Sequence, residues 1–136
     1  MKASNSSKRR RLAAEPAPAR GRAAEVVLDV DVDGDRVHLV LANCGDALAT
    51  DVTVEFSRPL GGPGDAPVSD LPVFKRLGVL RPGRTLRVFW NAASALFGRD
   101  DPFVATVTWN ERSRSRQRAE YRHDLSIYRR WPASLD

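Results

Sequence analysis

The sequence predicts an all-β protein, an antiparallel β-sandwich of about seven strands. Three observations favour this class. From residue 25 onward hydrophobic side chains recur at every second position, which is the period of a half-buried strand. The alternating runs are short, and Asp-Gly, Pro-Gly and Gly-rich segments separate them. At 136 residues the chain has room for one domain with a hydrophobic core.

The first three strands are expected over residues 26–32, 37–41 and 51–56. In the first, valine and leucine alternate with aspartate. In the third, aspartate, threonine and glutamate take the positions that face solvent. Asp33-Gly34-Asp35 lies between the first two strands and predicts a tight hairpin, because glycine readily adopts a positive φ.

The next segments depart from the period of two. Residues 59–67, rich in Gly and Pro, predict a long exposed loop. The apolar residues from Leu71 to Leu77 predict an irregular lid or a single helical turn. Alternation returns over residues 84–90, which form the next expected strand. A short helix is expected over residues 91–97, where it would cap one end of the sandwich.

The last two strands are expected over residues 103–109 and 118–124, with a polar turn over residues 110–115 between them. The inward face of each strand is apolar or aromatic, as a sandwich core requires. The apolar residues of 125–128 are expected to close the last strand. No internal repeat is visible.

Two corners punctuate the strands. Asn43-Cys44-Gly45 follows the second strand, where Asn and Gly are expected in the left-handed conformation that ends a strand sharply. Leu80-Arg81-Pro82-Gly83 precedes the strand at 84–90 and predicts a turn, because proline presets φ for a turn and glycine accepts φ > 0.

This order of elements resembles the immunoglobulin-type modules of bacterial surface proteins: a strand, an Asn-x-Gly corner, a second alternating strand and a Leu-x-Pro-Gly turn. The chain is most similar to the CARDB-like (cell-adhesion-related) group. The resemblance implies an immunoglobulin-like β-sandwich with one short helix in a connection. Modules of that group serve as spacers or binding domains on larger secreted chains.

Composition divides the chain into a disordered basic tail over residues 1–25, the sandwich over residues 26–130 and a C-terminal tail over residues 131–136. The first segment has no aromatic or β-branched residue, so it cannot bury enough surface to offset its ordering entropy. It carries seven Lys and Arg against two Glu, whereas the rest of the chain carries fifteen residues of each sign. The chain after residue 25 is therefore neutral, and the basic balance belongs to the tail.

Targeting signals and cysteine usage favour a bacterial, cytoplasmic protein. Lys8-Arg9-Arg10-Arg11 resembles the start of a secretory signal, but the apolar stretch of about 7–15 residues that must follow is missing. The single cysteine, Cys44, cannot form an internal disulfide, which fits a reducing compartment. The preference for Arg over Lys, with many Ala, Pro and Gly residues, indicates a GC-rich bacterial genome.

One motif resembles a calcium site. Residues 29–35 match the first seven positions of a helix-loop-helix calcium loop, Asp-x-Asp-x-Asp-Gly-Asp. That loop needs a bidentate Glu at its twelfth position, which is Val40 here, and it lies between helices rather than strands. We interpret the aspartates as the solvent-facing residues of a strand and its hairpin, and expect no metal site. Weak attraction of a cation stays open.

Catalytic constellations are also missing. His38 and His123 lie far apart in sequence, and no His-x-x-x-His or Cys-x-x-Cys spacing is present. Ser94 and Ser126 lack a Gly-x-Ser-x-Gly elbow. Cys44 could be an exposed nucleophile that either histidine approaches through folding, although a half-buried thiol in a turn is the commoner situation. We expect no enzyme, no catalytic residue and no cofactor.

The candidate binding surface is the basic end of the last hairpin and the residues that follow it: Arg112, Arg114, Arg116, Arg118, Arg122, Arg129 and Arg130. Several recur at period two, so they should project from one strand face and its turn. Such a ladder could hold phosphates or carboxylates. Interleaved acidic residues favour an ordinary solvated face instead.

The sequence predicts a non-enzymatic protein-interaction or scaffolding module whose partner is another protein. Such a partner should engage either the arginine-rich hairpin or a sheet edge. An alternative is tethering to nucleic acid or an anionic surface through the arginine-rich hairpin and Lys8, Arg9, Arg10 and Arg11. An uncharacterised hydrolase is the third hypothesis.

Overall fold

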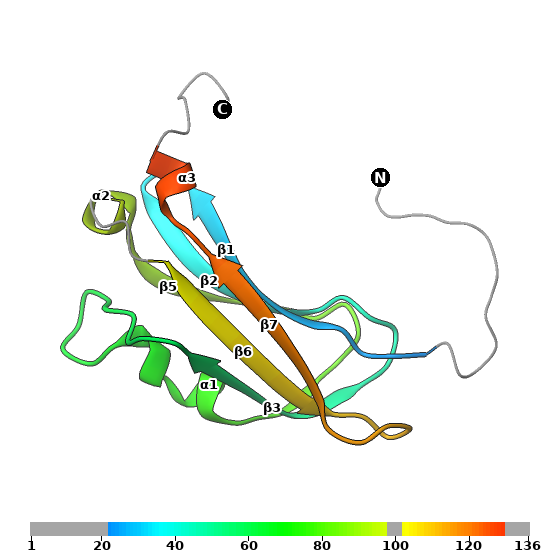
Figure 1. Cartoon of the computed structure of the whole chain (residues 1–136). Helices are drawn as coiled ribbons and strands as arrows, with labels where there is room; N and C mark the ends of the chain where they lie inside the picture. Colours follow the sequence, from blue (N-terminus) through cyan, green and yellow to red (C-terminus); the bar gives the residue numbers. More distant parts are fainter. Residues whose placement is uncertain (1–21, 98–101, 130–136) are drawn as a thin grey trace, which may run out of the picture.

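Two antiparallel sheets form a β-sandwich in the computed structural model, which describes residues 22–97 and 102–129 (Figure 1). One sheet has the order β1-β2-β5 and the other the order β4-β3-β6-β7. The strands are β1 (Val26–Asp33), β2 (Arg36–Asn43), β3 (Ala49–Phe56), β4 (Leu77–Leu80), β5 (Thr85–Ala92), β6 (Phe103–Asn110) and β7 (Gln117–His123). This split of seven sequential strands into two facing sheets is immunoglobulin-like, so the predicted fold class is confirmed.

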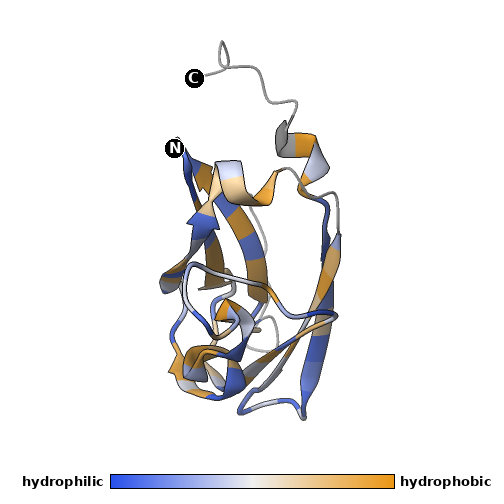
Figure 2. Cartoon of the chain, turned by 90° about the vertical axis from the view of Figure 1, so that its left-hand side faces the viewer, coloured by the Kyte–Doolittle hydropathy of each residue, from blue (hydrophilic) through white to orange (hydrophobic). Residues whose placement is uncertain are grey.

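Alternation builds the core. Hydrophobic and hydrophilic residues alternate along the longer strands (Figure 2), and in β1, β2 and β6 the buried residues recur at every second position. Trp90 on β5 is 1% exposed and meets the ring of Phe103 on β6 edge-on, with 5.5 Å between ring centroids. Phe56 on β3 lies beside both Phe103 and the buried Phe74. This aromatic cluster holds the two sheets together at the end of β3.

Short helices fill the connections. A 3-10 turn, η3 (Val68–Asp70), and α1 (Pro72–Lys75) follow the Gly- and Pro-rich loop, and α2 (Ala93–Leu96) follows β5. The β1–β2 hairpin holds the start of α2, because Asp35 accepts hydrogen bonds from Ala93 N through its carbonyl oxygen and from Ser94 N through its carboxylate. Gly34 in that hairpin has φ +62°, as its turn requires.

The corner after β2 differs from the prediction. Among the described residues only Asp51, Gly34 and Gly83 have a positive φ, so Asn43 and Gly45 are not left-handed. A Cβ on Gly45 would lie 2.2 Å from the carbonyl oxygen of Ala23, so this position needs glycine because another backbone segment passes against it. The predicted Leu-x-Pro-Gly turn does use a positive φ, +80° at Gly83.

Asn43 acts through its side chain, which is buried at 1% exposure. Its Oδ1 accepts hydrogen bonds from the backbone N–H groups of Glu25 (3.2 Å) and Gly45 (3.0 Å). Its Nδ2 donates to the carbonyl oxygens of Ala47 (2.9 Å) and Leu80 (3.0 Å). One amide therefore joins the entry to β1, the corner itself and the end of β4.

One expected element is wrong and one was missed. Residues 125–128 do not extend β7, because α3 (Ser126–Arg129) begins there. Asp124 starts this turn by accepting a hydrogen bond from Ser126 N, and Ile127 is left 59% exposed. Leu77–Leu80, where the sequence predicted no strand, forms β4.

The ordered domain also begins before Val26. Ala24 is 4% exposed. Ala23 N donates to the Asp46 carboxylate, and Asp46 N donates to Ala23 O. Residues 1–21, which make up most of the predicted tail, and Arg130 to Asp136 lie outside the described residues.

We predict that deleting residues 1–24 destabilises the domain relative to deleting residues 1–21. The longer deletion removes the two hydrogen bonds between Ala23 and Asp46, one to the Asp46 carboxylate and one between backbone groups, and each such hydrogen bond contributes about 1 kcal/mol. Urea denaturation of both truncated proteins should show a lower midpoint for the longer deletion at an equal m-value. Coincident curves would place the true domain boundary at Glu25 or later.

We predict that Asn43→Ala lowers the free energy of unfolding by about 3 kcal/mol, because it leaves buried backbone groups without partners. Asn91→Ala is the control, since the Asn91 side chain accepts one local hydrogen bond, from Ala92 N. That change should cost less than about 1 kcal/mol. Equal losses in urea denaturation would refute the special role of Asn43.

Candidate interaction surface

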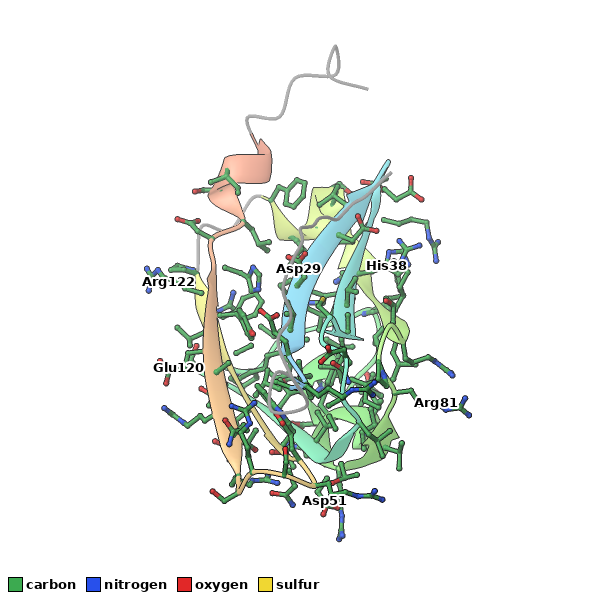
Figure 3. All side chains as sticks on the ribbon, turned by 90° about the vertical axis from the view of Figure 1, so that its right-hand side faces the viewer. Asp29, His38, Asp51, Arg81, Glu120 and Arg122 are labelled. Carbon is green, nitrogen blue, oxygen red and sulfur yellow. The ribbon has the colours of Figure 1, made fainter. Side chains whose placement is uncertain are left out.

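The arginine-rich hairpin does not present a single ladder of cations. Glu120 and Arg122 point outward from β7, on the side away from β1 (Figure 3). Arg118 also lies on this outer face, where its Nη2 is 2.7 Å from the Glu120 carboxylate. Arg112 is exposed in the β6–β7 turn. The side chains of Arg129 and Arg130 lie outside the described residues.

Arg114, whose side chain is 46% exposed, pairs with the buried carboxylate of Glu111. Its guanidinium contacts both carboxylate oxygens of Glu111, at 3.1 and 2.6 Å. The Glu111 side chain is 1% exposed and also accepts a hydrogen bond from Trp109 Nε1 at 3.0 Å. Burial alone raises the pKa of Glu111, but the bonds from Arg114 and Trp109, the charge of Arg114 and the Ala24 N–H outweigh it. The pKa of Glu111 is therefore lowered.

Arg116 lies across the outer face of the four-stranded sheet. It donates to the carbonyl oxygen of Asp51 (3.0 Å) and to the hydroxyls of Thr53 (3.3 Å) and Thr108 (2.7 Å). Asp51 has φ +49° and lies where the β3–β6 register shifts. A bulge of this kind re-aims the chain, and Asp tolerates the left-handed conformation better than most residues. Arg116 therefore braces the bulge.

The outer edge of β3 is open over its second half. Its ladder to β4 runs from Ala49 to Val52, where Val52 faces Leu77, and stops there because α1 precedes β4. Ser57 N donates to Val104 O on β6. Because hydrogen-bonding direction alternates along an antiparallel strand, the backbone groups of Val54 and Phe56 point the opposite way, toward the missing neighbour. The described chain supplies no hydrogen-bond partner for them.

A hollow of about 530 Å³ lies along this open edge. Its floor is the edge of β3, and its opposite wall comes from η3 and α1. The lining residues are Thr53, Val54, Glu55, Phe56, Ser57, Arg58, Pro59, Ser69, Asp70, Phe74 and Lys75. The unpaired backbone of β3 therefore lies beside this shallow, partly apolar hollow.

The edges of β1, β4 and β5 offer less. Tyr121 and His123 of β7 cover the edge of β1: Tyr121 Oη donates to Val26 O at 2.9 Å, and His123 Nε2 lies 2.8 Å from Leu28 O. On β4, the Leu80 carbonyl is bound by Asn43, so the alternation leaves Gly78 alone facing outward. The chain beyond β3 crosses to β5, where Trp90 Nε1 donates to Gly61 O.

The residues considered for catalysis or metal binding do not converge. His38 contacts Arg87 on the outer face of the three-stranded sheet, whereas His123 faces inward from the other sheet. Desolvation, followed by the carboxylates of Glu25 and Asp29, raises the pKa of the Cys44 thiol. It is therefore protonated near neutral pH.

The aspartates of the calcium-like motif are divided among separate tasks. Asp31 pairs with Arg87, with 2.6 Å between the charged atoms, and Asp35 holds the start of α2. Within residues 22–97 and 102–129 no group of three or more His, Cys, Asp and Glu side chains could hold a metal ion.

Comparison with protein families places the chain. Residues 2–129 match the family described as Domain of unknown function (DUF8453). The chain belongs to this family. Comparison with curated proteins and with solved structures found no match. In the described part of the chain, no helix has the length and apolar character to cross a membrane.

Sequence reasoning predicted a sheet edge as one binding mode without locating it. Part of the sequence signal for the open edge of β3 lies in the segment before β4. Leu-Pro-Val-Phe-Lys at residues 71–75 carries proline at the first helical position, which favours a helical turn directly before β4. A helix there prevents β4 from pairing with all of β3.

We predict that acid removes the stabilisation that Glu111 contributes. Because its folded pKa lies below the unfolded value of about 4.3, this contribution is present above pH 4.3 and is lost as pH falls through the folded pKa. Glu111→Gln should therefore be clearly less stable than the unmodified protein at pH 7, and the difference should shrink by pH 3. Urea denaturation at both pH values measures it.

Glu120→Gln is the matched control, since the Glu120 pair with Arg118 is exposed and contributes little. A gap between Glu111→Gln and the unmodified protein that stayed constant with pH would contradict the assigned direction of the pKa.

Proposed function

We propose that this domain is a non-enzymatic protein-interaction module that receives an extended segment of its partner as an additional strand on β3. The open backbone of Val54 and Phe56 beside the hollow carries the proposal. An antiparallel strand docked there would satisfy the N–H and C=O groups of both residues, and each new hydrogen bond adds about 0.5–1.5 kcal/mol net. Side chains of the incoming strand would fill the hollow and supply selectivity.

The state of the arginines favours this mode over tethering to a polyanion. Arg114 is neutralised by Glu111, Arg118 is paired with Glu120, and Arg116 is held by three acceptors on the sheet. A polyanion that bound these arginines would have to break these contacts before its phosphates could make their own. The protonated Cys44 thiol and the separated histidines likewise speak against a hydrolase.

We propose further that the domain is related to CARDB-like modules, which serve as spacers or binding domains, and that it acts in a bacterial cytoplasm. Its immunoglobulin-like strand order supports the first point. A lone Cys44 fits a bacterial cytoplasm, because the fold is held by its core rather than by disulfides.

We predict that a random library of displayed twelve-residue peptides contains binders that occupy this hollow. Lys75→Trp should abolish their binding, because Lys75 lines the hollow and a larger ring would fill it. Arg81→Trp is the control, since Arg81 is exposed in the turn after β4, away from the hollow. Fluorescence titration of a selected peptide against the three proteins provides the measurement.

A second pair of variants tests the backbone. Val54→Pro removes the N–H that points into the hollow and spares the ladder to β6, whereas Val54→Ala shortens the side chain and keeps the N–H. Binding should survive Val54→Ala and be lost in Val54→Pro, with melting curves confirming that both variants fold. The proposal fails if the library yields no binder, or if its binders tolerate both Lys75→Trp and Val54→Pro.

A further inference from the structure

We infer that the strand received by β3 carries a Lys or Arg opposite Glu55, flanked by small or β-branched residues, an inference that rests on the proposed function. Glu55 lies between Val54 and Phe56, the two residues whose backbone is open. Its side chain is exposed and points to the outer face, because its neighbours in the strand point to the core. A residue placed opposite it on a new strand would have its Cβ about 4.5–5.5 Å away.

Glu55 is the charge in the hollow that lacks a counter-charge among the described residues. On β6 its cross-strand neighbour is Thr106, and beyond that Glu120 on β7 is paired with Arg118. No ion pair involving Glu55 is present in the described chain.

The other charged residues that line the hollow are already engaged. Lys75 Nζ lies 3.6 Å from the Asp70 carboxylate. The Arg58 guanidinium donates to the carbonyl oxygens of Pro59 and Pro102, at 3.3 Å each. An incoming basic residue therefore meets one carboxylate with no prior partner, and cross-strand pairs of opposite charge are favourable.

The inward side of the hollow sets the flanking residues. Positions on the new strand opposite Val54 and Phe56 share their inward face and approach Phe74, which is fully buried, and the small, buried Ser69. Because Phe74 and Ser69 already close the inward side, we expect Val, Thr, Ser or Ala to fit there better than an aromatic residue. The preferred core of the segment is a basic residue between two such residues.

A second copy of this chain is the less favourable occupant. Two copies related by a two-fold axis would pair β3 with β3, and the register that uses both open residues sets Val54 opposite Phe56. That register brings Glu55 directly opposite Glu55 of the second copy. Like charges in this position destabilise a strand pair. Hence the chemistry of the edge selects a basic segment of another protein.

The test uses two synthetic ten-residue peptides of alternating Thr and Val with a single central Lys or a single central Glu. The unmodified protein should bind the Lys peptide about fivefold or more tightly than the Glu peptide, as a cross-strand charge pair of about 1 kcal/mol implies. Glu55→Lys should reverse the order. Glu120→Lys makes the same charge change two strands away on the same face and should leave the preference for the Lys peptide in place.

Chemical shifts of the Val54 and Phe56 amides would follow binding, and melting curves would confirm that both variants fold. Equal affinity for the two peptides, with those amides shifted, would overturn the basic preference and leave strand addition standing. If neither peptide moves those amides, the basic preference and the proposed function both fail. A concentration-dependent dimer by sedimentation, which the peptides cannot dissociate, would identify a second copy as the occupant and also overturn the inference.

Discussion

The buried side-chain amide of Asn43 is the interaction on which the arrangement of this domain depends. It lies at the end of β2, in the three-stranded sheet, and donates to Leu80 O at the end of β4, in the other sheet. Its oxygen holds the chain that enters β1. A side-chain amide has two donors and one acceptor oxygen with two lone pairs, and here all four positions are used.

The position of β4 explains the open edge. Asn43 fixes the end of β4 at Leu80, and the helical turn α1 ends just before it, at Lys75. Between these limits β4 has four residues, whereas its neighbour β3 has eight. The remaining half of β3 pairs with β6 on one side and has no strand on its outer edge. Open edges favour aggregation, and an exposed charge such as Glu55 together with the walls of η3 and α1 limits pairing with unsuitable strands.

Most of the fold could be predicted from local sequence patterns, whereas the open edge of β3 could not. A period of two gives strands, and Gly34 and Gly83 mark their turns, because these signals depend on residues close in sequence. Asn43 was interpreted as a backbone signal, whereas its role depends on Leu80, far along the chain. The start of α3 was predictable from Asp124 followed by Ser126, an N-terminal helix signal that the apolar residues beside it concealed.

The open edge escaped prediction for the same reason. Which strand lies beside β3, and for how many residues, is a long-range property. The four residues of β4, with Gly78 among them and Val79 53% exposed, show no alternation that would mark a strand. The bulge at Asp51 likewise depends on Arg116, whose period-two spacing suggested a solvated ladder and not a brace across the sheet.

Amide hydrogen exchange along β3 tests the open edge most directly. With no strand on the outer edge of its second half, the amides of Val54 and Phe56 should exchange quickly. Those of Glu55 and Ser57, which face β6, and of Val52, which faces β4, should be protected. Such an alternating record over the four consecutive residues from Val54 to Ser57 has no other source in this fold. Uniform protection from Val52 to Ser57 would show that the edge is already covered, and would contradict strand addition at this site.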